Sequence, residues 1–222
     1  RFLSLVVEPK TSRLVDQGSI FKVKEMTQML LYGFLAIGLP AVCLSYLLGT
    51  SILSIYISED IGLEAGNSLW VLMLGSTLFG LVMLLNSCLL SFRKTKRLFY
   101  VNLIAAGTNG VLNLVIFNFY ADIMVAAVTT LISYIVLLIL TVKSVQSVVE
   151  IKVIDDETIR IVICSLGSFF LVQKLQLSVD SPLTLLGMLT VGSIYMCTYL
   201  GSMFLLSSKV ISAYHWKKFN QI

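Results

Sequence analysis

Charged residues are scarce in this chain of 222 residues, at 13% of the sequence against about 25% in an average soluble domain. Hydrophobic residues make up 57%, and the mean hydropathy is +0.93. A water-soluble globule of this size cannot cover its surface with so few charges. The shortage excludes an ordinary soluble protein and predicts an integral membrane protein.

The sequence also lacks the motifs of common enzyme and metal sites. No HExxH, GxSxG, P-loop or GxGxxG pattern occurs, and no Asp or Glu falls in the core of an apolar run. The only histidine, His215, stands beside Trp216 and is typical of an interfacial anchor. The cysteines are far apart, without zinc-site spacing, and we expect them to be small apolar side chains in helices: Cys43, Cys88, Cys164 and Cys197. We therefore expect that the protein is not an enzyme and has no catalytic residue, metal or cofactor.

Long apolar runs, in contrast, are abundant. A bilayer core needs about 20 mainly apolar residues per helix, and six stretches qualify: residues 27–48, 67–92, 98–118, 123–142, 159–177 and 183–207. The opening residues, RFLSLVVEP, are typical of the end of a further span. The chain begins with Arg rather than Met and shows no signal-peptide pattern. We expect an all-α membrane protein that forms the later part of a longer chain.

The basic residues gather on one side of this arrangement. If the six spans alternate, 15 of the 16 Lys and Arg share one side, and the connections 49–66, 119–122 and 178–182 on the other side hold none. The positive-inside rule then places the basic side and both chain ends in the cytoplasm. It predicts a short cytoplasmic turn built on Arg93, Lys94, Lys96 and Arg97. So short a turn leaves little room for a nucleic-acid groove, and we expect no nucleic-acid partner.

Polar side chains inside the spans indicate more than a lipid anchor. Asn102, Asn109 and Asn113 lie within about 20° of one line along the third span, with Ala106 nearby. Because unpaired amides in lipid cost several kcal/mol, the stripe faces either another helix or a cavity that contacts a polar ligand. The same two interpretations apply to Asn86 in the second span, and to Thr130 and Tyr134 in the fourth.

Three further features concern helix geometry. Pro40 interrupts the first span and predicts a kink. Lys174 is either a buried cation for an anionic ligand or a side chain that snorkels outward from a helix end. The only GxxxG pattern, Gly62 to Gly66, falls in an expected loop, so we do not interpret it as a span-dimerisation motif.

The organisation that follows has five segments. Residues 143–158 are mixed in charge and end in a candidate N-cap, Asp155 or Asp156, so we expect a cytoplasmic linker. The full division is 1–26 (end of a preceding helix and cytoplasmic segment), 27–142 (four spans), 143–158 (linker), 159–208 (two additional spans) and 209–222 (basic cytoplasmic tail).

Four stretches together resemble the polysaccharide-exporter branch of the multidrug/oligosaccharidyl-lipid/polysaccharide flippase superfamily. They are PKTSRLVDQG (9–18), AIGLP (36–40), LLGTSILSIYIS (47–58) and the long run from Ile104 to Tyr134. The likeness covers most of residues 3–142 and consists of many weakly specific positions. It departs from the family pattern at the turn 118–122, which lacks the usual Pro and Gly, and at Val125, where Gly is common.

The resemblance implies a MATE-like fold of two six-helix bundles followed by two extra helices. This chain would hold the end of the eighth helix and helices nine to fourteen, with the N-terminal half of the same chain as its partner. The implied activity is flipping of a polyprenyl-diphosphate-linked saccharide across the plasma membrane by alternating access. The substrate-path candidates are Asn102, Asn109, Asn113, Asn86, Tyr134 and Lys174.

Three alternatives stay open at this point. A flippase of peptidoglycan precursors is a close variant of the same activity. A cation-coupled multidrug exporter of the same superfamily would need an ionisable carboxylate inside the membrane, and the spans of this chain contain none. A non-transporting multi-pass scaffold is the third, and it has no need of an in-span Asn stripe or of Pro40.

Overall fold

The computed structural model describes residues 2–117, 122–176 and 185–206, and these ranges contain seven helices and no strand. The helices are α1 (Phe2–Asp16), α2 (Ile20–Tyr56), α3 (Glu59–Ser91), α4 (Thr95–Phe117), α5 (Ile123–Gln146), α6 (Asp156–Gln176) and α7 (Leu185–Leu205). Within these ranges, six helices, α2 to α7, are long and apolar enough to cross a membrane. The prediction of an all-α, multi-pass membrane protein is therefore confirmed at this level.

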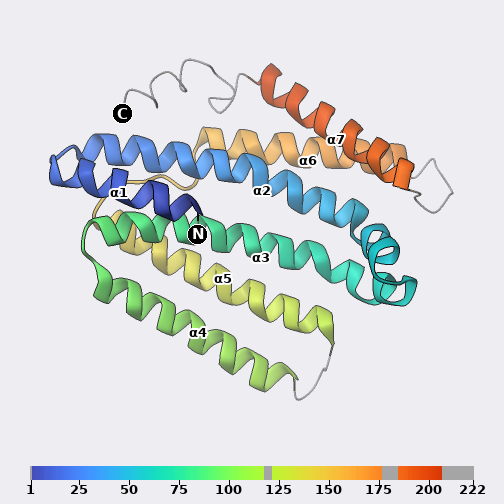
Figure 1. Cartoon of the computed structure of the whole chain (residues 1–222), viewed down its shortest axis with the longest axis horizontal. Coiled ribbons are helices and arrows are strands. Elements are labelled where there is room, and N and C mark those ends of the chain that lie inside the picture. The colour runs from blue at the N-terminus through green and yellow to red at the C-terminus, as the bar shows by residue number, and fades with distance from the viewer. Residues whose placement is uncertain (1, 118–121, 177–184, 207–222) are drawn as a thin grey trace.

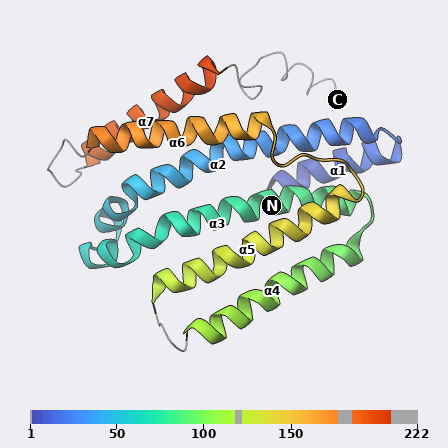
Figure 2. The same ribbon diagram turned by 180° about the vertical axis from the view of Figure 1, so that it is seen from behind.

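The helices are arranged around the pair α2 and α3. The α6–α7 pair lies against α2 on one side, and α5 and then α4 follow α3 on the other (Figures 1 and 2). Helix α1 packs across α3 and α2. Large apolar side chains remain exposed on the outer helices, among them Leu114, Phe170 and Leu186. Such a surface suits lipid, because apolar side chains there need no covering by protein.

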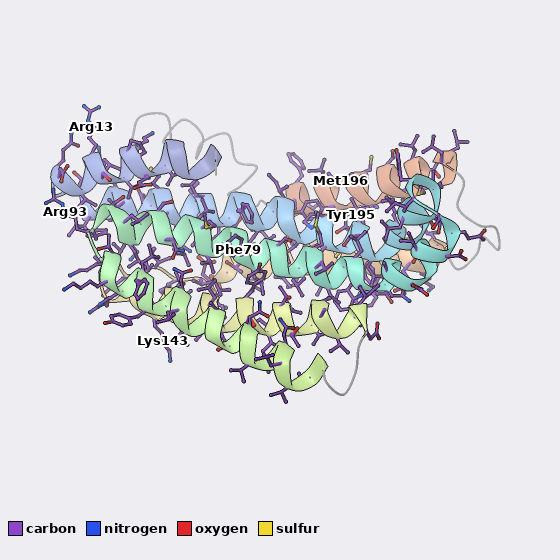
Figure 3. All side chains as sticks on the ribbon, turned by 60° about the horizontal axis from the view of Figure 1, so that its bottom comes forward. Arg13, Phe79, Arg93, Lys143, Tyr195 and Met196 are labelled. Atoms are coloured by element: carbon purple, nitrogen blue, oxygen red, sulfur yellow. The ribbon has the colours of Figure 1, made fainter. Side chains whose placement is uncertain are left out.

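The basic side chains gather toward one end of the bundle. Arg13, Arg93 and Lys143 lie toward the same end in Figure 3. The α1–α2 turn, the α3–α4 turn and the α5–α6 connection meet at that end, so the charge separation expected from the sequence is present in space. Its assignment to the cytoplasm stays a prediction. The connection 178–182 and the tail 209–222 lie outside the described residues.

Two expected connections are much shorter than the sequence suggested. Helix α2 begins at Ile20, so the end of the segment 1–26 is helical. Gly18, at φ +68°, ends α1, and the N–H groups of Gly18 and Ser19 donate to Val15 and Leu14. The expected loop 49–66 is wrong: α2 continues to Tyr56, and α3 begins at Glu59 after an N-cap at Ser58.

The GxxxG pattern lies inside α3 and packs it against α2, which corrects the prediction that it falls in a loop. A Cβ atom on Gly66 would lie 2.6 Å from the Cα of Thr50, and one on Gly62 would lie 2.9 Å from the Cα of Ser54. Small residues let two membrane helices approach until their backbones touch, which strengthens van der Waals packing. Polar flanking residues made this segment look like a loop, although both helices continue through it.

The connection between α5 and α6 is docked on α2. Gln28 donates to the carbonyl of Lys152 and accepts from the N–H of Lys152 at 3.2 Å. The Tyr32 hydroxyl donates to Asp155, whose Oδ1 accepts from the N–H of Thr158 at 3.0 Å. Of the two candidate N-caps, Asp155 is the one that caps α6. The linker is therefore held in place rather than loosely tethered.

The glycine contact gives a test of the α2–α3 interface. Gly66→Ala should lower the free energy of unfolding by about 1–3 kcal/mol, because its methyl group overlaps the backbone of Thr50. Gly110→Ala on α4 is the matched control, since a Cβ atom there meets nothing within 4 Å. Unfolding in detergent micelles measures both. Equal stability of the two variants would contradict the close contact.

Candidate functional site

A chain of hydrogen bonds joins α4 to α5 inside the membrane-spanning region. Thr129 Oγ1 donates to Oδ1 of Asn113 at 2.7 Å, and Asn113 Nδ2 donates to Oδ1 of Asn109 at 2.9 Å. Thr129 is buried, whereas both amides are half-buried. These three residues form what we call the amide cluster. Two of the three predicted stripe residues therefore come together, and Asn113 is bonded to a neighbouring helix.

The rest of the stripe on α4 is uncovered. Asn102 is exposed, and its Nδ2 donates to the carbonyl of Leu98 in its own helix at 2.8 Å. Ala106 and Gly110 are exposed beside it, with nothing within 4 Å of a Cβ atom at Gly110. The exposed positions of the stripe are Asn102, Ala106 and Gly110, and α4 is the least buried of the candidate spans. Amides on a spanning helix are normally turned toward protein or a water-filled cavity.

A second polar position lies between α3 and α5. The rings of Phe79 and Tyr134 pack at 5.1 Å, and the two helices run in the same direction (Figure 1). Two turns further along each helix, the same facing sides carry Asn86 and Thr141. Both are buried, and within the described residues Asn86 Oδ1 and Thr141 Oγ1 have no hydrogen-bond partner. We call Asn86 and Thr141 the buried pair.

The buried pair is costly unless its two groups share a partner. An unsatisfied buried acceptor or donor costs about 1–3 kcal/mol. A water molecule between α3 and α5 that both groups reached would satisfy them together. Thr130, by contrast, bonds only to the carbonyl of Ala126 in its own helix, at 2.9 Å.

A third set of polar side chains, not predicted from the sequence, joins α2 to the α6–α7 pair. The Tyr199 hydroxyl donates to the carbonyl of Ala36 at 2.9 Å. Ser165 lies 3.0 Å from the Tyr195 hydroxyl and 3.4 Å from the Cys43 sulfur. We call Cys43, Ser165, Tyr195 and Tyr199 the tyrosine seam. The signal in the sequence was Pro40, which lies in the same stretch of α2 and removes a backbone donor.

The remaining predicted residues lie apart from these groups. Lys174 is exposed in the last turn of α6, on the other side of the α2–α3 pair from the amide cluster. That position suits snorkelling, and the structure does not bring Lys174 to the amides. Pro40 is buried inside α2, which is helical throughout and changes direction near its middle in Figures 1 and 2. The predicted path residues therefore do not form one site.

The predicted basic turn has an unusual backbone. Arg93 ends α3 at φ +57°, a left-handed conformation that favours glycine. The N–H groups of Arg93 and Lys94 donate to Leu90 and Leu89, at 2.8 and 3.0 Å. Lys96 and Arg97 open the next helix, and Arg97 donates to the side chain of Ser147 in the α5–α6 connection. An arginine thus stands where glycine would fit better, which is consistent with a role for its positive charge.

A shallow hollow lies on α1 toward the same basic end. It measures about 440 Å³ and is lined by Pro9, Lys10, Arg13, Leu14 and Gln17. Lysine and arginine side chains are the usual partners of phosphate groups in proteins. The hollow therefore offers an anionic group two cations, Lys10 and Arg13.

Comparison of the chain with protein-family models, with characterised proteins and with solved structures gives no match. The function of the protein is therefore inferred from its residues and from the resemblance described above. The amide cluster is the best-defined part of the predicted polar stripe, because hydrogen bonds of 2.7 and 2.9 Å join its members across two helices.

Loss of the interhelical bond in the amide cluster should weaken the bundle. Thr129→Val removes the hydroxyl at nearly constant volume and should lower the free energy of unfolding by roughly 0.6–2 kcal/mol. Thr108→Val is the control, since Thr108 bonds only to the carbonyl of Ile104 in its own helix, at 2.9 Å. Thermal unfolding in lipid nanodiscs distinguishes them. A control as destabilised as Thr129→Val would show that the α4–α5 bond contributes nothing of its own.

Proposed function

We propose that this chain is part of a flippase that moves lipid-linked oligosaccharide or polysaccharide precursors across the plasma membrane by alternating access. The observation that supports it best is the uncovered polar stripe of α4. Asn102 is exposed and the amides of Asn109 and Asn113 are only half-buried, on a helix with the composition of a membrane span. A lipid anchor or a passive scaffold has no use for amides in that position.

The chemistry of such a substrate explains why a polar face is needed. A saccharide linked through a diphosphate carries many hydroxyl groups and negative charge, and neither crosses hydrocarbon unaided. Amide side chains donate and accept hydrogen bonds, so they can replace water around sugar hydroxyl groups. In this proposal the stripe of α4 contacts the sugar chain while the polyprenyl tail stays in lipid.

The charges support the same proposal. Positive-inside topology would place the basic end in the cytoplasm. There the hollow of Lys10 and Arg13 on α1 is close to where a diphosphate would enter. The proposal also includes a MATE-like arrangement, in which a first bundle from the preceding part of the chain faces this one and rocks against it. The polyprenyl-diphosphate-linked saccharide and membrane lipid are then its partners.

The experiment reconstitutes the protein, together with the preceding half implied by the resemblance, in vesicles with a fluorescent polyprenyl-diphosphate saccharide. The label that becomes accessible on the far side reports translocation. Replacing Asn109 and Asn113 together by Leu should reduce the rate at least about tenfold, the factor that corresponds to about 1.4 kcal/mol of lost transition-state binding. Asn102→Leu should also slow flipping, although its side chain bonds to no other helix.

Thr129→Val is the matched control for this experiment. It breaks the bond between α4 and α5 but leaves both amides in place. Rates reduced by the Asn variants but not by Thr129→Val place the amides on the path. Equal losses in both would make the cluster structural. Absence of translocation, with ion-driven export of a dye instead, would replace the proposal with the cation-coupled exporter, and inactivity in both assays would favour the scaffold.

A further inference from the structure

The bend region of α2 contains a backbone carbonyl that its own helix cannot satisfy. In an α-helix the carbonyl of residue 36 accepts from the N–H of residue 40. Residue 40 is Pro40, which has no N–H, and its ring pushes against the same carbonyl. In hydrocarbon no water is present to take the place of the missing donor, so an unsatisfied carbonyl there is costly.

Helix α7 supplies the donor. The Tyr199 hydroxyl donates to the Ala36 carbonyl at 2.9 Å, across a separation of 163 residues in the chain. Tyr199 is 3% exposed, so water does not compete for its hydroxyl. Its ring stacks on that of Tyr195, one turn earlier, with the ring centroids 6.4 Å apart. The hydroxyl is therefore held at the carbonyl by packing and does not swing freely.

The neighbouring contacts fix the same three helices together. Tyr195 is fully buried, and its hydroxyl lies 3.0 Å from Ser165 on α6. Ser165 in turn contacts Cys43, which lies one turn beyond Pro40 on α2. The tyrosine seam thus holds α2 on both sides of the proline, at Ala36 and at Cys43.

We propose that Tyr199 is a positioning residue whose hydroxyl replaces the amide hydrogen bond missing at Pro40 and so sets the bend of α2 through the α6–α7 pair. The inference concerns the shape of α2 and does not depend on the proposed substrate. It gives the α6–α7 pair a specific task, which is to hold the proline-containing helix in one conformation. In a transporter, α2 would then bend only as far as the seam permits.

A double-mutant cycle tests the bond. Tyr199→Phe should lower the melting temperature of the purified protein by about 2–4 °C, the shift expected for one lost hydrogen bond in a chain of this size. Pro40→Ala restores an N–H that donates to the Ala36 carbonyl. In the Pro40→Ala background, Tyr199→Phe should therefore have little effect. A Tyr199→Phe effect of the same size in both backgrounds would overturn the proposal.

Two controls keep the cycle specific. Tyr195→Phe removes a hydroxyl from the same seam, but its partner is Ser165, so Pro40→Ala should not change its effect. Pro40→Leu restores the same N–H and refills the volume that Pro40→Ala leaves empty. Rescue of Tyr199→Phe by both residues at position 40 supports the hydrogen bond. Rescue by only one of them, or equal rescue of Tyr195→Phe, would assign the effect to packing and contradict the proposal.

A distance measurement tests the positioning role separately from stability. Phe21 and Tyr56 are exposed near the two ends of α2, so Phe21→Cys and Tyr56→Cys can carry spin labels. The exposed Cys197 is first replaced by alanine, whereas the buried Cys43 is kept because it belongs to the tyrosine seam. Tyr199→Phe should broaden or shift the distance distribution between the labels, because the bend is no longer held. In the Pro40→Ala background the distribution should be narrow with either residue at position 199. An unchanged distribution in Tyr199→Phe would show that the seam does not set the bend.

Discussion

The constraint on which this structure depends is that hydrocarbon offers no hydrogen bonds to the backbone. Within the described spans, the backbone N–H and C=O groups are paired mainly inside their own helix. Many side-chain hydroxyl groups likewise donate to a carbonyl one turn earlier in the same helix. Thr27, Thr77 and Ser133 donate to Val23, Met73 and Thr129 of their own helices. Polar contacts between helices arise where a helix lacks a backbone donor or carries more polar groups than it can pair itself. Proline removes a donor in α2, and the amides of α4 have more hydrogen-bonding capacity than their own helix can use.

The α2–α3 pair provides the fixed frame to which the other helices attach. Its backbones are in contact at Gly66, where a single methyl group does not fit. The α6–α7 pair attaches to α2 through the tyrosine seam and through Asp155. Helices α5 and α4 attach to α3 through the Phe79–Tyr134 contact and an apolar cluster of Val82, Val101, Ala105 and Leu137. The two flanks also meet each other at the basic end, where Val145, Val149, Ile151 and Ile161 share one buried core with α2 and α3.

Much of the architecture could be predicted from sequence, because hydrophobic runs and charge positions are local signals. All six spans are present as helices, Arg13, Arg93 and Lys143 lie toward one end, and the N-cap expected at the start of α6 is present. The errors concern contacts between distant segments. Polar residues around Gly62 and Gly66 resembled a loop because nothing in their own stretch shows that α2 packs on them. The stripe of α4 was visible from its period, whereas its partner Thr129 and the Tyr199 contact depend on how helices are placed in three dimensions.

The contact between Tyr199 and Ala36 also has a consequence for the order of synthesis. The two residues are 163 positions apart, so at about 5–20 residues per second the carbonyl of Ala36 enters the bilayer roughly 10–30 s before its donor exists. During that interval α2 is a proline-broken helix with an unpaired carbonyl, and its bend is not yet defined. A helix that is made late, α7, thus completes one that is made much earlier, and a ribosome that stops short of α7 would leave α2 inserted but unfinished.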